Sequence, residues 1–130
     1  MARIMIVDDA LMMRMTLRKF LEKAGHEIVG EAINGEQAIL NYPQCQPDLV
    51  TMDITMPGLG GIETIKRIIE SNPAANIIVV SALSQKRFVF EALENGAKNY
   101  VSKPITEDKL LSVINLVLAQ NSLVEENKVC

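Results

Sequence analysis

The chain has 130 residues, of which 48% are hydrophobic and 22% charged, as is typical of one globular domain rather than a disordered chain. Its net charge of −3 offers no basic surface for DNA or an anionic membrane, and no apolar run reaches the ~18 residues of a transmembrane helix. Two cysteines, Cys45 and Cys130, are too few for a disulfide framework and are typical of a reducing compartment, so we expect a cytoplasmic protein.

Short apolar runs alternate along the chain with segments of helical spacing. The predicted strands are residues 4–7, 28–30, 49–52, 77–80 and 100–101, the second being flanked by glutamates like an edge strand. The predicted helices are residues 17–24, 35–42, 62–69, 88–93 and 106–118, the second ending before Pro43. The central strands are apolar throughout, which indicates a sheet that helices cover on both faces.

This alternation predicts a single α/β domain. We expect a doubly wound, five-stranded parallel sheet with five helices and the flavodoxin-like strand order 2-1-3-4-5. Residues 1–120 are assigned to this domain, and residues 121–130 to a polar C-terminal tail that frays.

Polar residues stand where the predicted strands end. In an open parallel sheet, ligands bind outside the carboxyl ends of the strands, so these side chains are expected to converge. Singly, each has an ordinary role as an N-cap, a loop hydroxyl or a solvated charge. Clustered carboxylates, however, repel one another unless a cation lies among them, and an all-oxygen ligand set favours Mg²⁺. The residues at the strand ends are Asp8, Asp9, Asp53, Ser81 and Lys103.

Five short motifs occur in a fixed order: Val7-Asp8-Asp9, Met52 to Pro57, Val80-Ser81-Ala82, Gly96-Ala97 with Tyr100, and Lys103-Pro104. In sequence and spacing, this set resembles the receiver domains of bacterial two-component response regulators, as far as about residue 119. Within that family the chain is most similar to the stand-alone chemotaxis regulators.

The resemblance implies a role for each residue of the predicted site. Asp53 is the phosphoacceptor, which takes a phosphoryl group from a sensor histidine kinase. Mg²⁺ is held by Asp9, Asp53 and the backbone carbonyl of Thr55, and by Asp8 through a water molecule. Lys103 pairs with the acceptor carboxylate and then with the phosphate, and the Lys103–Pro104 peptide is cis.

The resemblance also implies a signalling module, not an enzyme, that assists its own phosphorylation and dephosphorylation. Ser81 and Tyr100 are the switch residues, and they change a surface on the fourth helix, the fifth strand and the fifth helix. The implied target is a flagellar motor switch protein, and a phosphatase is a possible further partner. Phe88 and Phe90 cannot both face inward on a regular helix, so one of them is a candidate exposed anchor for a partner.

Two other functions of this architecture fit the sequence less well than a receiver. A Mg²⁺-dependent aspartyl phosphatase would need an acid two residues after Asp53, where the chain has Thr55. A flavodoxin-like cofactor carrier would need a phosphate-binding loop where Asp8 and Asp9 stand. As a receiver, the chain could instead be a phosphorelay intermediate or a fragment of a larger regulator. One departure from the family is the run Gly58-Leu59-Gly60-Gly61, which predicts an unusually mobile loop.

Overall fold

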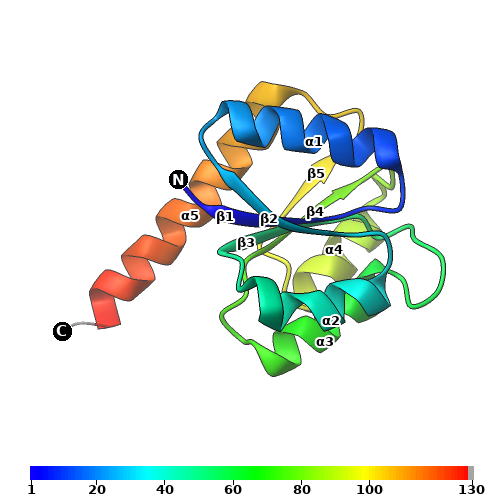
Figure 1. Cartoon of the computed structure of the whole chain (residues 1–130). Coiled ribbons are helices and arrows are strands. Elements are labelled where there is room, and N and C mark those ends of the chain that lie inside the picture. The colour runs from blue at the N-terminus through cyan, green and yellow to red at the C-terminus, as the bar shows by residue number, and fades with distance from the viewer. Residues whose placement is uncertain (129–130) are drawn as a thin grey trace.

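Five strands and five helices alternate along the chain in a computed structural model, which describes the backbone of residues 1–128 and the side chains of residues 1–121 (Figure 1). The strands are β1 (Arg3–Val7), β2 (Glu27–Ala32), β3 (Leu49–Met52), β4 (Ile77–Ser81) and β5 (Asn99–Ser102). The helices are α1 (Leu11–Lys23), α2 (Gly35–Cys45), α3 (Gly61–Ser71), α4 (Lys86–Glu94) and α5 (Glu107–Lys128).

The sheet is parallel throughout and has the strand order β2-β1-β3-β4-β5, which confirms the predicted fold and topology. The central strands β1, β3 and β4 are almost entirely buried, as their continuous apolar runs predict. β2 lies at one edge and is only partly buried. Because all five strands are parallel, their carboxyl ends lie on the same side of the sheet, and the loops that follow them gather there.

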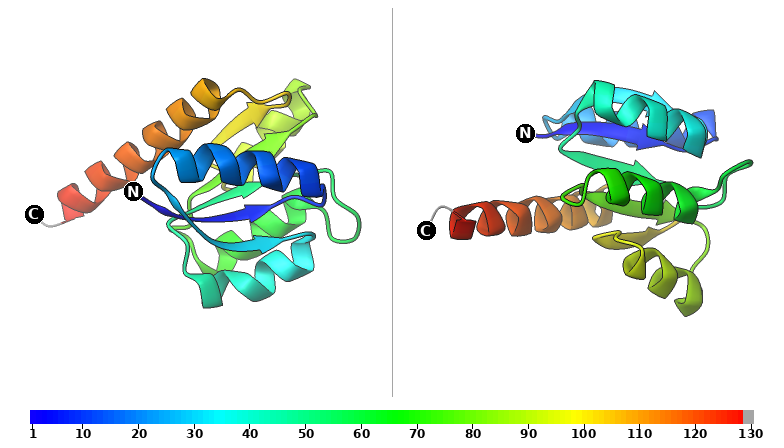
Figure 2. Two further views of the ribbon diagram at one scale, coloured as in Figure 1. Left: turned by 45° about the horizontal axis from the view of Figure 1, so that its top comes forward. Right: turned by 90° about the horizontal axis from the view of Figure 1, so that it is seen from below.

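Helices cover both faces of the sheet (Figures 1 and 2). On one face, α1 and α5 supply Leu17, Leu21, Leu110 and Ile114 to a core with strand residues such as Ile6. On the other face, α2, α3 and α4 pack on the alternate side chains of the same strands. That second core contains Ala38, Ile65, Ile68, Ala92, Met5 and Val79. Burial of these apolar faces is the main force that holds the two layers to the sheet.

The end predicted for the second helix is wrong. α2 does not stop before Pro43 but continues through it to Cys45. Proline lacks an N–H, so α2 lacks one helical hydrogen bond at this position. Gln46 caps the helix with a left-handed backbone (φ 47°), and its N–H donates to the carbonyl of Tyr42.

The last helix extends further than predicted. α5 continues through Lys128, into the segment 121–130 that the sequence assigns to a tail, and its last turns project beyond the sheet (Figure 1). Cys130 lies outside the described residues. In the part of the chain that is described, neither α5 nor any other helix has both the length and the apolar character needed to cross a membrane.

Candidate functional site

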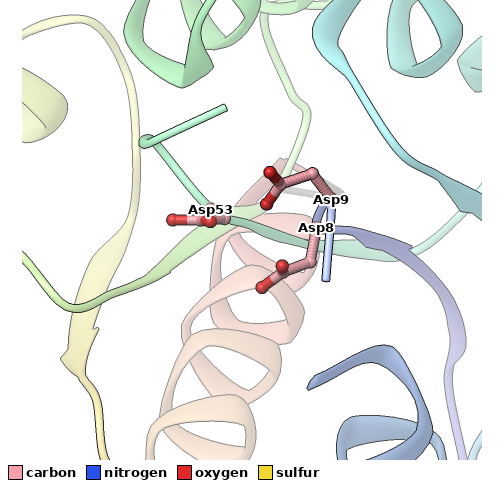
Figure 3. Close-up of side chains that lie close together, drawn as sticks. All are labelled: Asp8, Asp9 and Asp53. Carbon is pink, nitrogen blue, oxygen red and sulfur yellow. The ribbon is translucent and has the colours of Figure 1, made fainter. Parts of the chain in front are cut away.

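Three carboxylates meet where β1 and β3 end (Figure 3). Val7 pairs with Met52 in the β1–β3 register, so Asp8 and Asp53 directly follow two residues that lie side by side. Asp9 comes next in the chain. Each of the three side chains offers a carboxylate oxygen, and these oxygens all lie within 4.8 Å of one another. Sheet register thus brings together residues that are 45 positions apart, as the sequence predicts.

Lys103 reaches this cluster from the loop after β5. Its backbone N–H donates to the carbonyl of Ser81 at 2.8 Å, which ties the loop to the end of β4. Its ammonium lies 3.0 Å from Oδ2 of Asp8 and 3.7 Å from Oδ2 of Asp53. The following peptide, Lys103–Pro104, is cis, as the family resemblance implies. Lys103 therefore bridges two of the three carboxylates.

Asp8 is buried, and both of its carboxylate oxygens have partners. Its Oδ1 accepts a hydrogen bond from the N–H of Ala10 at 2.9 Å, while its Oδ2 faces Lys103. The N-cap of α1 is Ala10, which has no side-chain cap, so Asp8 does not serve as the N-cap of that helix. Both carboxylate oxygens of Asp8 are engaged in forming the site.

Asp53 is buried, with 3% of its surface exposed, and bonded within its own loop. The N–H and the hydroxyl of Thr55 donate to its Oδ1 at 3.2 and 3.1 Å. Burial raises the pKa of Asp53 above its ordinary value, and the charge of Asp8 acts in the same direction, while Thr55 and Lys103 oppose the shift. Lys103 and Thr55 thus only partly compensate the negative charge of the ionised Asp53 carboxylate.

Asp9 is exposed and, among the described residues, receives no hydrogen bond or ion pair on its carboxylate. Among the described residues, the ammonium of Lys103 pairs with two of the three carboxylates, so negative charge remains in excess. The donors are all hard oxygens, which suits Mg²⁺, an ion that keeps several waters and takes only one or two carboxylates. The residues present therefore fit a divalent cation of this kind.

Ser81 and Tyr100 meet at Leu83, beside the carboxylates. Ser81 is fully buried, and its Oγ accepts a hydrogen bond from the N–H of Leu83 at 3.1 Å. The Tyr100 hydroxyl donates to the carbonyl of the same residue. Burial raises the pKa of Tyr100 above its ordinary value. The two predicted switch residues are thus joined through one peptide segment at the start of the β4–α4 loop.

The family model described as response regulator receiver domain matches residues 4–115 of the chain. The chain is a receiver domain of this family. Chemotaxis protein CheY of Thermotoga maritima is 47% identical over 115 residues, which cover 88% of this chain and 96% of that protein. Chemotaxis protein CheY of Bacillus subtilis is 47% identical over 116 residues, with 89% and 97% covered.

Solved receiver structures share the whole fold. A chain in the CheX-CheY-BeF3-Mg²⁺ complex from Borrelia burgdorferi has a TM-score of 0.87 at 33% identity, covering 89% of this chain and 88% of that one. The response regulator domain of Thermotoga maritima CheB has a TM-score of 0.84, also at 33% identity, with 90% and 96% covered. This receiver domain is accordingly a signalling module of two-component systems, close to CheY, and not an enzyme in the ordinary sense.

Two contacts around the receiver site were not predicted from the sequence. Arg14 donates to the backbone carbonyl of Asp8 at 2.8 Å, and Glu36 accepts from the N–H of Leu59 at 3.0 Å. Both join a helix to a loop that carries site residues. Neither leaves a signal in the sequence, because an arginine or glutamate on a helix surface is ordinarily solvated.

Proposed function

We propose that this receiver domain is phosphorylated on Asp53 by a sensor histidine kinase and thereby changes its affinity for a downstream protein. In the transfer, a carboxylate oxygen of Asp53 forms a bond to phosphorus as the phosphorus–nitrogen bond of the kinase phosphohistidine breaks. The electron pair of that bond stays on the histidine nitrogen. The observation that carries the proposal is the convergence of three carboxylate oxygens within 4.8 Å, with Lys103 beside two of them.

Asp9, Asp53 and the carbonyl of Thr55 would hold Mg²⁺, with Asp8 acting through a water molecule. When bound, Mg²⁺ supplies positive charge against the phosphoryl oxygens as the group is transferred. Lys103 adds a second positive charge, first to the acceptor carboxylate and then to the phosphoryl group. Transfer and later hydrolysis are assisted by these residues of the domain itself.

Ser81 and Tyr100 would convert phosphorylation into a change at the surface. A hydrogen bond donated by Ser81 to the new phosphoryl group would reorient the hydroxyl that now accepts the N–H of Leu83. The Tyr100 hydroxyl donates to the carbonyl of Leu83, so a shift of Leu83 would move the side chain of Tyr100 on β5. Their shared contact with one residue supports coupling between the site and the outer face of the domain.

The downstream surface would lie on α4, β5 and α5. Phe88 packs on the core, whereas Phe90 on α4 is 63% exposed, which confirms that only one of the two faces inward. Leu93 on α4 and Leu116 on α5 are also exposed. Apolar side chains outside the core are suited to contact another protein.

The similarity to CheY proteins supports chemotaxis, with a flagellar motor switch protein as the target and a phosphatase that resets the signal. A cytoplasmic location belongs to the same proposal. A second candidate is a phosphorelay intermediate, which would pass the phosphoryl group to another histidine protein. The same Asp53 chemistry serves both, so the site residues are common to the two functions.

The test is phosphorylation with acetyl phosphate and Mg²⁺, followed by intact-protein mass spectrometry. We expect the wild type to gain one phosphoryl group and Asp53→Asn to gain none, because the amide keeps the shape of the side chain but is no nucleophile. Asp108→Asn is the matched control, since Asp108 is an exposed carboxylate on the first turn of α5. Equal labelling of Asp53→Asn and the wild type would refute the assignment.

A further inference from the structure

Arg14 connects three elements next to the carboxylate cluster. It lies on α1, its Nη1 donates to the backbone carbonyl of Asp8 at 2.8 Å, and its Nε donates to Oε1 of Glu31 in β2 at 3.0 Å. Only 13% of the side chain is exposed. The planar guanidinium fixes the directions of both donors at once, which an ammonium group cannot do.

Arg18 lies one turn further along α1 and uses the same glutamate. Its guanidinium contacts Oε2 of Glu31 at 2.6 Å and Glu22 at 3.1 Å. It makes no contact with Asp8 among the described residues, and 39% of its side chain is exposed. The two arginines thus share Glu31, but Arg14 alone extends to the strand end that carries the carboxylates.

The carbonyl that Arg14 holds belongs to the peptide between Asp8 and Asp9. That peptide is planar, so fixing the direction of its C=O also fixes the position from which the Asp9 side chain extends. Among the described residues no group donates to the Asp9 carboxylate, so the backbone contacts around this peptide are the ones that place Asp9. A change in the direction of the peptide would move the Cα of Asp9 relative to Asp53.

We propose that Arg14 is a positioning residue for the divalent cation site, acting through the Asp8 carbonyl on the Asp8–Asp9 pair. The inference rests on the Mg²⁺ site of the proposed function. Residues that orient metal ligands without touching the metal commonly change its affinity by about 10- to 100-fold when they are replaced.

The experiment measures the Mg²⁺ dissociation constant by isothermal titration calorimetry for the wild type, Arg14→Met and Arg18→Met. Both variants lose one positive charge and one ion pair to Glu31, and circular dichroism checks that each is folded at the temperature used. We expect Arg14→Met to bind Mg²⁺ roughly tenfold more weakly than the wild type, and Arg18→Met to bind like the wild type.

The direction of the effect separates positioning from two other roles. A loss of positive charge by itself strengthens binding of a cation, and a purely structural role lowers stability while leaving the dissociation constant of the folded protein unchanged. Weaker binding in Arg14→Met alone supports positioning. If Arg14→Met binds Mg²⁺ as tightly as Arg18→Met or more tightly, the inference is overturned.

Arg14→Lys provides a second variant in case Arg14→Met does not fold. It keeps the positive charge, but an ammonium group cannot direct donors at the Asp8 carbonyl and Glu31 at once, so we expect weaker Mg²⁺ binding than in the wild type and in Arg18→Met. Binding equal to that of Arg18→Met would overturn the inference. A wild type that binds no Mg²⁺ would instead refute the metal site itself, and this inference with it, while phosphorylation of Asp53 is judged separately by the labelling experiment.

Discussion

At the scale of single residues, Thr51 places a polar hydroxyl within the apolar centre of the sheet. It lies in the middle of β3, between Ile6 of β1 and Ile78 of β4, and is 1% exposed. Among the described residues its hydroxyl has no hydrogen-bond partner. A buried hydroxyl that makes no hydrogen bond has lost its hydration without compensation, which costs about 1–3 kcal/mol.

Thr51→Val is therefore expected to raise the free energy of unfolding by about 1 kcal/mol, because valine has nearly the same shape and no polar atom to desolvate. Thr64 on α3 is the matched control: it is also fully buried, but its hydroxyl donates to the carbonyl of Gly60 at 2.6 Å. Thr64→Val should lose about 1 kcal/mol through that hydrogen bond. Urea denaturation measures both changes, and a destabilised Thr51→Val would contradict the argument.

At the scale of elements, α2 holds the loop between β3 and α3. Gly58 has a positive φ of 83°, and a Cβ added there would lie 3.1 Å from the Glu36 carboxylate. The same carboxylate accepts the N–H of Leu59. Gly61 must lack a Cβ as well, since one would lie 2.3 Å from the Cα of Ile54. The glycines thus permit the close approach through which Glu36 contacts the loop that the sequence predicts to be mobile.

Replacing Glu36 should release this loop. We expect Glu36→Ala to speed hydrogen exchange of the Leu59 amide by roughly fivefold, which corresponds to the loss of about 1 kcal/mol from one hydrogen bond. Glu36→Gln keeps a side-chain carbonyl that can accept the same N–H, so its effect should be smaller. Amide exchange followed by NMR measures both variants. Unchanged exchange in Glu36→Ala would mean that other contacts hold the loop.

At the scale of the whole molecule, we expect the carboxylate cluster to link global stability to divalent cations. The pKa of Asp53 is raised in the folded state, so the folded protein binds more protons than the unfolded chain just above the ordinary pKa of an aspartate. Stability from this group is complete below that ordinary pKa and is lost as the pH rises through the folded-state pKa. At neutral pH the ionised carboxylate therefore opposes folding until a cation balances it.

Mg²⁺ is accordingly expected to stabilise the wild type, by about 2.7 kcal/mol when its free concentration is about 100 times the dissociation constant. Asp9→Asn should respond far less, because it removes a carboxylate that no other described group engages. Asp108→Asn, which removes an exposed carboxylate outside the cluster, should respond like the wild type. Thermal unfolding with and without Mg²⁺ measures the shifts, and equal shifts in Asp9→Asn and the wild type would argue against Asp9 as a ligand.

The fold can be predicted from the spacing of apolar residues because that spacing reflects which face of each element is buried. The run from Leu49 to Met52 is apolar throughout since helices cover both faces of β3, and its predicted ends agree with the structure. Helix ends are less well predicted. α1 begins at Leu11, well before the apolar stripe that starts at Leu17, and Met12 and Met15 in its first turns are exposed. Periodicity detects only the part of a helix that packs on the core.

The sequence by itself determined that Asp8, Asp9, Asp53, Ser81 and Lys103 stand at strand ends, and parallel topology then required them to meet. Only the tertiary structure decided how they are supported. Arg14 contacts the Asp8 carbonyl, and Glu36 contacts the Leu59 amide 23 residues away. Local pattern records which face of an element is buried, whereas these contacts depend on how separate elements pack and on where side chains reach backbone groups. The strand ends can thus be predicted from the sequence, but the contacts around the site are set by packing.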